Sequence, residues 1–169
     1  MRDFVTLRLN GKTLNIRGVS PTRTLLEYLR ETERLKGTKE GCAEGDCGAC
    51  SIVLVRINEY GKTVYDVVNS CLLILPQLDG ANVVTVEGLD QDGLIDPVQS
   101  AIVQSDGSQC GFCTPGMLMA AADLLVSNPK ATRQEIREYL SGNYCRCTGY
   151  QAIVDAVETV GQIRNGGST

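Results

Sequence analysis

The sequence predicts an α+β fold in which a small sheet-rich domain precedes a small helical domain. Up to about residue 87, apolar residues alternate with polar ones, as half-buried strands require. Beyond residue 96 the recurring features are helix-capping motifs. A polar stretch with two glycines and three aspartates, residues 88–96, separates the two patterns. We therefore expect one domain over residues 1–88, a second over 89–164, and a disordered tail over 165–169.

The first elements expected are a β-hairpin and a short helix. Alternating apolar residues over 5–9 and 14–16 flank Asn10-Gly11, a strong signal for a two-residue hairpin turn. Thr24 and Glu27 have the spacing of a capping box, so a helix should begin there and run through Leu29. A Gly-rich and Cys-rich loop is expected over 37–50. Further strands are expected at Ser51–Ile57, 63–68 and 82–86, with a turn at 58–61.

The second half is predicted to be helical because cap motifs recur along it. Asp96 and Thr114 each precede a proline, which suits an N-cap followed by the first helical position. Thr132 and Glu135 form a second capping box, and that helix should end near Gly142. Helices are thus expected after Asp96-Pro97, over 117–126, from Thr132 to Gly142, and over 151–163. The apolar runs 72–75 and 118–126 should lie in the core.

The composition of the chain excludes several kinds of catalytic site, metal site and partner. The chain has eight cysteines and no histidine, which excludes a Ser–His triad, a Cys–His nucleophile pair and a mixed Cys/His zinc site. A net charge of −4 disfavours nucleic acid as a partner, because a phosphate-binding surface needs clustered Lys and Arg. No apolar run approaches the roughly 20 residues of a membrane span. The first residues show no signal-peptide pattern, so we expect a cytoplasmic protein.

The first cysteine set has the spacing of plant-type [2Fe–2S] ferredoxins. Cys42, Cys47 and Cys50 follow the pattern C-x4-C-x2-C, and Cys71 comes later, at the end of a strand. Such a cluster with its thiolates carries a charge of about −2, which backbone N–H groups must compensate. Small residues let the backbone approach the sulfurs closely. Those among the cysteines are Gly41, Ala43, Gly45, Gly48 and Ala49.

The second set is formed by Cys110 and Cys113, and by Cys145 and Cys147. Each pair lies beside a predicted helix boundary, where free N–H groups and the helix dipole favour an anionic group. By itself this spacing also suits a different metal.

A disulfide framework and a zinc site are the alternatives to iron–sulfur clusters. A disulfide framework suits short secreted chains, whereas this chain has 43% hydrophobic residues and needs no covalent staples. Four-cysteine zinc sites usually consist of two separated C-x2-C knuckles, whereas C-x4-C-x2-C puts three ligands in one loop.

Gln109, just before Cys110, is either a simple loop residue or a polar contact to a partner.

Three segments together resemble the iron–sulfur portion of the molybdenum hydroxylases, the xanthine dehydrogenase and aldehyde oxidoreductase family. They are Gly-Cys-Ala-Glu-Gly-Asp-Cys-Gly-Ala-Cys at 41–50, Gln-Cys-Gly-Phe-Cys-Thr-Pro-Gly at 109–116, and Asn-Tyr-Cys-Arg-Cys-Thr-Gly-Tyr at 143–150. The likeness covers about residues 4–160 and fills every cysteine position. Tyr144, where the family would be expected to have an aliphatic residue, is a departure that touches no ligand.

The resemblance implies a fold and a set of site residues. The first domain would be a plant-ferredoxin-like β-grasp with one cluster near a flavin. The second would be a four-helix bundle whose cluster lies next to the molybdopterin. Gln109 and the ligand Cys147 would lie close to the pterin. The implied iron ligands are Cys42, Cys47, Cys50 and Cys71 for one cluster, and Cys110, Cys113, Cys145 and Cys147 for the other.

The resemblance also implies a function and partners. The chain would be a non-catalytic, electron-transfer subunit of an oxidoreductase, passing electrons from molybdenum through two [2Fe–2S] clusters to FAD. Its partners would be an FAD-binding medium subunit and a molybdopterin-binding large subunit, in a dimer of heterotrimers. Residues 44–46 and 71–78 look most like the xanthine dehydrogenase branch, so purines (xanthine or hypoxanthine) or N-heteroaromatics are the expected substrates. The alternatives are an aldehyde or an aromatic thioester as substrate, a free-standing two-cluster ferredoxin, and a zinc-binding interaction module.

Overall fold

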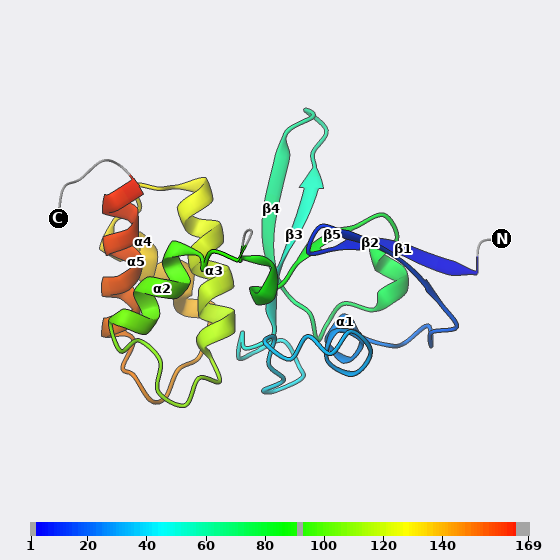
Figure 1. The fold of residues 1–169 in the computed structure, drawn as a ribbon, viewed down its shortest axis with the longest axis horizontal. Coiled ribbons are helices and arrows are strands. Elements are labelled where there is room, and N and C mark those ends of the chain that lie inside the picture. The colour runs from blue at the N-terminus through cyan, green and yellow to red at the C-terminus, as the bar shows by residue number, and fades with distance from the viewer. Residues whose placement is uncertain (1–2, 91–92, 165–169) are drawn as a thin grey trace.

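The computed structural model describes residues 3–90 and 93–164. A five-stranded sheet with one short helix lies on one side of the molecule, and the helices α2 to α5 pack together on the other (Figure 1). The predicted α+β class is confirmed. The predicted tail, 165–169, lies outside the described residues, as do two positions of the predicted linker. We call residues 3–88 the sheet region and residues 96–164 the helical region.

The sheet has the strand order β2-β1-β5-β3-β4. β1 and β5 run parallel, and the other neighbours are antiparallel. Asn10 and Gly11 both have positive φ, 46° and 83°, which confirms the predicted hairpin turn between β1 and β2. The strands are β1 Phe4–Leu9, β2 Lys12–Arg17, β3 Ser51–Ile57, β4 Thr63–Asn69 and β5 Asn82–Val84. β5 ends earlier than predicted because the chain turns into a 3-10 helix at Val86–Gly88.

The predicted capping box at Thr24 is present. The backbone N–H of Glu27 donates to Thr24 Oγ1 at 3.2 Å, and the backbone N–H of Thr24 donates to Glu27 Oε2 at 2.9 Å. The helix α1, Leu25–Glu27, continues as a π-helical turn, Tyr28–Thr32, and so extends past the predicted end at Leu29. Leu25 and Leu29 are fully buried against one part of the sheet. A further 3-10 helix lies at Leu75–Leu78.

The helical region has four α-helices, and the predicted caps hold at two of them. They are α2 Pro97–Gln104, α3 Thr114–Ser127, α4 Arg133–Tyr139, which ends in a 3-10 turn at Leu140–Gly142, and α5 Gln151–Arg164. Asp96 Oδ1 accepts the N–H of Val98 at 2.8 Å, and Thr132 Oγ1 accepts the N–H of Glu135 at 3.3 Å. None of the helices in the described ranges is long and apolar enough to cross a membrane.

The prediction of Thr114 as an N-cap is wrong. Cys113 takes the cap position without a side-chain cap bond, and Thr114 is the first helical residue. The Thr114 hydroxyl therefore lies one position too far along the chain to cap the helix. It lies 2.9 Å from the Ser108 hydroxyl instead and ties down the loop before α3.

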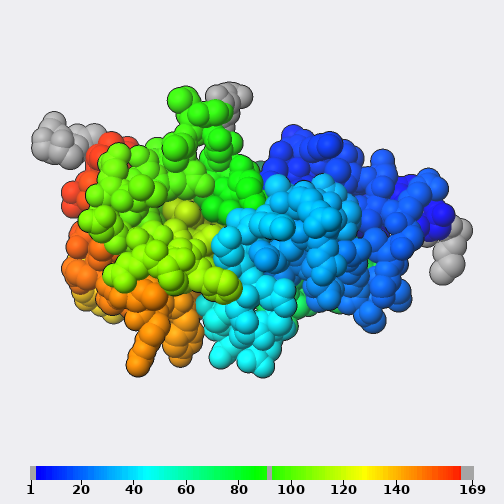
Figure 2. Space-filling model, turned by 60° about the horizontal axis from the view of Figure 1, so that its bottom comes forward, coloured from blue at the N-terminus to red at the C-terminus, as the bar shows by residue number. Residues whose placement is uncertain are grey.

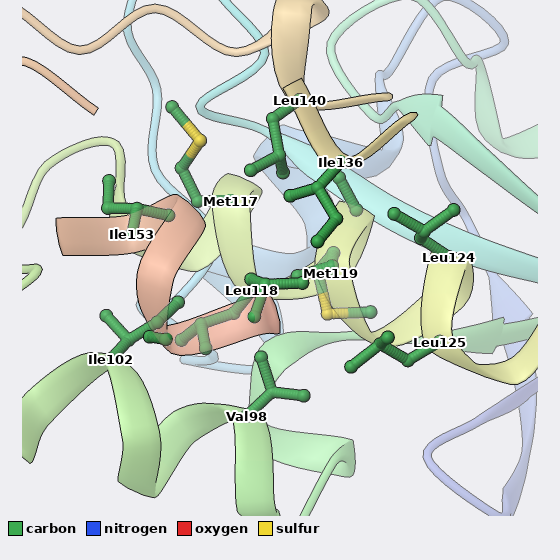
Figure 3. Packing of buried hydrophobic residues seen from close by; sticks show 14 of the residues in the cluster. Val98, Ile102, Met117, Leu118, Met119, Leu124, Leu125, Ile136, Leu140 and Ile153 are labelled. Carbon is green, nitrogen blue, oxygen red and sulfur yellow. The ribbon is translucent and has the colours of Figure 1, made fainter. Parts of the chain in front are cut away.

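One hydrophobic core joins the two regions. Val53 and Val86 of the sheet region belong to the same buried cluster as α2, α3, α4 and α5. Figure 3 shows Val98, Ile102 and Ile153 pointing into this cluster beside the α3 side chains. The predicted core run 118–126 is buried up to Leu125, whereas in the run 72–75 only Leu75 is fully buried and Leu73 and Ile74 are partly buried. Leu72 is 60% exposed and Val126 is 56% exposed, because Leu72 follows the end of the strand pair and Val126 lies in the last turn of α3.

Candidate metal centres

All eight cysteines are free thiols, and they interact in two groups of four. The first group belongs to the sheet region and the second to the helical region. Figure 2 shows that the segment near residue 45, in cyan, lies against the segment near residue 110, in yellow-green, with the orange segment near residue 145 beside them. The loops that carry the cysteines thus meet at one face of the molecule.

The β3–β4 strand pair brings Cys50 and Cys71 together. Cys50 directly precedes β3, and Cys71 follows the end of β4; Ser51 and Asn69 between them are register partners. The Sγ atoms of Cys50 and Cys71 lie 3.3 Å apart, and both residues are buried. The antiparallel ladder therefore fixes this thiol pair before any ligand is considered.

Backbone N–H groups surround the other two thiols of this group. The N–H groups of Asp46 and Cys47 donate to Cys42 Sγ at 3.3 and 3.4 Å. The N–H of Cys42 donates to Cys47 Sγ at 3.4 Å. Hydrogen bonds from the Glu44, Cys47 and Asp46 backbones lower the pKa of Cys42 to about 7. The loop is therefore arranged to stabilise negative charge on sulfur, as an anionic cluster requires.

Glycines, which have no side chain, allow the backbone of this loop to approach the sulfurs closely. A Cβ on Gly41 would lie 2.7 Å from Cys47 Sγ. A Cβ on Gly45, where φ is +84°, would lie 2.3 Å from Leu72 Cδ1. Leu72, which the sequence placed in the core, instead covers this loop from outside. Asn69 Nδ2 donates to the Gly45 carbonyl at 2.7 Å and ties the loop to the end of β4.

The helical region presents an exposed pair and an inner pair of thiols. Cys110 and Cys147 are exposed, with their Sγ atoms 3.5 Å apart. Cys113 and Cys145 interact with each other more deeply in the structure. The Cys145 Sγ lies 3.1 Å from the Thr148 hydroxyl, and the Cys145 N–H donates to the Tyr150 hydroxyl at 2.7 Å.

Cys71 and Cys113 resist ionisation on their own. Burial, followed by the neighbouring Cys50 thiol, raises the pKa of Cys71 to about 12. Burial, followed by the Cys145 thiol, raises the pKa of Cys113 to about 12. A metal that binds these sulfurs must displace their protons, so metal uptake by this chain would release protons.

The arrangement in pairs tests which metal group the thiols fit. Among the described residues, no three Cys, Asp or Glu side chains converge on a point that could hold a single ion. A four-cysteine zinc site needs four such convergent thiolates. A [2Fe–2S] cluster uses four cysteines on two irons, so each iron takes two. The pairs Cys42–Cys47, Cys50–Cys71, Cys110–Cys147 and Cys113–Cys145 fit this requirement.

The other predicted site residue, Gln109, lies on the exposed side of the second group. It directly precedes Cys110 and is itself exposed. Cys147, the second residue expected near a pterin, pairs with Cys110 at this surface. The structure thus places Gln109 and Cys147 at the same open end of the helical-region group.

Sequence reasoning missed a contact between the two cysteine groups. The N–H of Tyr144 donates to the Cys47 carbonyl at 2.9 Å, and Asn143 Nδ2 donates to the Gly48 carbonyl at 2.9 Å. Asn143 lies two positions before Cys145, and its polar side chain is buried. This burial is a property of the fold, so the sequence pattern contains no signal for the contact.

Family comparisons identify both cysteine groups. Residues 7–74 match the family model described as "2Fe-2S iron-sulfur cluster binding domain". Residues 85–158 match the model described as "[2Fe-2S] binding domain". The two matches cover the first and the second cysteine group respectively, so two [2Fe–2S]-binding domains are present.

Several relatives share most of this chain. A xanthine dehydrogenase from Emericella nidulans is 44% identical over 158 residues, which are 93% of this chain and 12% of that protein. The human aldehyde oxidase is 44% identical over 153 residues, 89% of this chain and 11% of that protein. The chain therefore spans about an eighth of the length of these curated relatives.

Solved structures agree with the sequence relatives. An aldehyde oxidoreductase from Desulfovibrio gigas matches with a TM-score of 0.84 and 37% identity, over 98% of this chain and 17% of that chain. A quinoline 2-oxidoreductase from Pseudomonas putida 86 matches with a TM-score of 0.81 and 38% identity. That second match covers 98% of this chain and 98% of the other chain.

Proposed function

Because the chain belongs to the molybdenum hydroxylase family, as its iron–sulfur part, we propose that it relays electrons from a molybdenum site to FAD. The relatives are oxidoreductases, and this chain is the iron–sulfur part of such an enzyme. The observation that carries the proposal is the arrangement of all eight thiols in pairs, two pairs to a group. The chain itself would be non-catalytic.

Each thiol pair would hold one iron. In the sheet region, Cys42 and Cys47 would bind one iron, and Cys50 and Cys71 the other. In the helical region, the exposed pair, Cys110 and Cys147, would bind one iron, and the inner pair, Cys113 and Cys145, the other. When bound, each cluster supplies a site that gains and loses a single electron. The chain would contribute N–H donors, burial and fixed positions.

The order of transfer follows from exposure and from the family. Cys110, Cys147 and Gln109 form the open end of the second group, which suits contact with a pterin on another polypeptide. The second group touches the first through the Tyr144 N–H and the Cys47 carbonyl. We therefore propose transfer from molybdenum to the helical-region site, then to the sheet-region site, and then to FAD.

Partners and domains are proposed from the matched lengths. The quinoline 2-oxidoreductase chain is almost completely covered by this one, which supports a separate small subunit. We propose an FAD-binding medium subunit, a molybdopterin-binding large subunit and a dimer of heterotrimers. Within the chain, residues 1–88 would form a plant-ferredoxin-like β-grasp domain and 89–164 a four-helix bundle domain.

A substrate class and a location are part of the same proposal. Both xanthine dehydrogenase and quinoline 2-oxidoreductase are named for N-heteroaromatic compounds, which supports a purine or another N-heteroaromatic as the substrate class. We also propose the cytoplasm as the location of the chain, because ligation of iron by all eight cysteines requires them in the reduced state.

The test is an EPR spectrum of the purified, dithionite-reduced protein, with iron and acid-labile sulfide counted on the same sample. We expect two distinguishable [2Fe–2S] signals and about four irons and four sulfides per chain. A silent spectrum, with zinc in place of iron, would contradict the proposal. Co-purification distinguishes the two alternatives: a subunit should purify with two larger chains, whereas a free-standing ferredoxin would purify alone.

A further inference from the structure

We propose that Asn143 is a positioning residue: its side-chain amide fixes the helical-region cysteines on the sheet-region cysteine loop and so sets the separation of the two cluster sites. The inference rests on the proposed iron–sulfur function for the presence of the clusters. It concerns a residue that is neither a cysteine nor part of the exposed surface around Gln109.

The contacts of Asn143 cross between the regions. The residue is 5% exposed, although its side chain is polar. Its Nδ2 donates to the Gly48 carbonyl at 2.9 Å and lies 3.4 Å from Ser51 Oγ. Ser51 Oγ donates to the same carbonyl at 2.8 Å. The Gly48 carbonyl thus accepts hydrogen bonds from both regions in a buried position, where a lost partner is costly.

The backbone beside Asn143 makes a second link between the two cysteine groups. The N–H of Tyr144 donates to the Cys47 carbonyl at 2.9 Å. Cys47 belongs to the first group, and Tyr144 directly precedes Cys145 of the second. A single hydrogen bond therefore joins the backbones of two cysteine-bearing segments, and the Asn143 amide holds the adjacent residue in register with it.

Glycines bring the two regions into this contact. A Cβ on Gly116, in the first turn of α3, would lie 2.1 Å from the Gly48 carbonyl oxygen. A Cβ on Gly48, where φ is +71°, would lie 2.4 Å from the Gly142 carbonyl oxygen. The two segments touch backbone to backbone and leave no free space between them. A small movement at Asn143 would therefore change the position of one segment relative to the other.

This arrangement assigns Asn143 a role in setting the distance between the two cluster sites, and no role in binding iron. The hydrogen bonds of its side chain go to Gly48 and Ser51, so replacing it removes none of the eight thiol ligands. Electron transfer between two centres falls steeply with their separation, and so does the magnetic interaction between two reduced centres. Loss of the amide should therefore weaken that interaction while both clusters remain.

The experiment compares the wild-type full chain with Asn143→Leu, which keeps the size of the side chain and removes the donor. Iron and sulfide are counted first, and EPR spectra are then recorded for the fully reduced proteins. We expect unchanged iron content and unchanged signals of the separate clusters, with a loss of the splitting that arises from their interaction. Exchange of the Tyr144 amide hydrogen should also become faster.

Tyr144→Ala is the matched control, because its side chain is 69% exposed and its hydrogen bond comes from the backbone. It should keep the splitting. Should Asn143→Leu take up no iron, Asn143→Ser retains a polar group too short to reach Gly48 and is measured in its place. Full splitting in an Asn143 variant with both clusters would overturn the inference. A wild-type protein without clusters would overturn the proposed function itself.

Discussion

At the residue scale, the space around a glycine decides whether a side chain there would disturb a cysteine ligand. Gly41 and Gly142 show the difference within one face of the molecule. A Cβ on Gly41 would meet Cys47 Sγ, whereas a Cβ on Gly142 would meet nothing within 4 Å. Neither glycine has a positive φ, so the two positions differ in their surroundings and not in backbone conformation.

Gly41→Ala should therefore displace the Cys47 sulfur and lower the iron bound by the sheet-region site. Gly142→Ala should keep the iron content of the wild type. Iron and sulfide counts on both purified variants, together with their EPR spectra, measure this difference. Equal iron in the two variants would show that the loop can yield around a methyl group.

Asp123 in α3 is a buried carboxyl group, and burial disfavours its charged form. Asp123 is 5% exposed and accepts a hydrogen bond from the Tyr139 hydroxyl. Its Oδ1 has no hydrogen-bond partner among the described residues. Burial raises the pKa of Asp123, the Tyr139 hydrogen bond opposes this, and Asp66 adds to it. The folded protein thus holds this proton to higher pH than the unfolded chain, in which Asp titrates near pH 4.

The contribution of Asp123 to stability should decline as pH rises above about 4 and through its raised pKa. Asp123→Asn removes that decline and should be more stable than the wild type at pH 7 by about 1 kcal/mol. Urea unfolding at pH 5 and pH 7 tests it. A less stable Asn variant at pH 7 would mean that the carboxylate is better solvated than its burial indicates.

At the scale of elements, helix caps stabilise the helical region. Thr132 makes a complete capping box with Glu135 in front of α4. Thr114, which was predicted as a cap because proline follows it, lies inside α3 and caps nothing. The two threonines therefore differ in energy although a cap was predicted at each.

Thr132→Ala should lower the free energy of unfolding by about 1 kcal/mol. Thr114→Ala should cost clearly less, because only the contact with Ser108 is lost. Thermal unfolding of both variants under the same conditions gives the comparison. The reverse order of stability would mean that the Ser108–Thr114 contact matters more than the cap.

Local patterns predicted local features well. The hairpin at Asn10-Gly11 and the capping boxes at Thr24 and Thr132 depend only on neighbouring residues, and all are present. Thr114 failed because the preceding cysteine occupies the cap position, which is set by the folded loop. Leu72 failed because its exposure depends on where β4 ends.

The contact at Gly48 could not be predicted. Asn143 and Gly48 are 95 positions apart, and no sequence periodicity relates them. The cysteine spacing identified the groups of thiols, but the pairing within each group required the distances between sulfurs. Spacing specifies which residues share a loop, whereas pairing depends on how the strands and helices bring separate loops together.

At the scale of the whole molecule, the two cysteine groups draw on separate segments. Cys47 and its partners come from residues 42–71, and Cys113 and its partners from residues 110–147. Each group has its own scaffold, the sheet in one case and the helices in the other. Damage to one group should therefore leave the other able to bind iron.

Cys113→Ser should reduce the iron from about four to about two per chain and remove one EPR signal. Cys47→Ser should remove the other signal, which makes the two variants reciprocal controls. In the assembled enzyme both should lose turnover with a physiological acceptor. Full turnover by a variant that lacks a cluster would show that electrons reach the acceptor by another route.

The close packing of Gly48 against Gly116 and against the Gly142 carbonyl also limits how the chain can be recombined. A cysteine loop taken from an unrelated ferredoxin, with any side chain at this position, would clash with the helical region. A helical region with any larger residue than glycine at position 116 would reject the original loop. The two halves are therefore expected to be exchangeable between relatives only as a matched pair, and chimaeras that keep both glycines are the ones that should assemble.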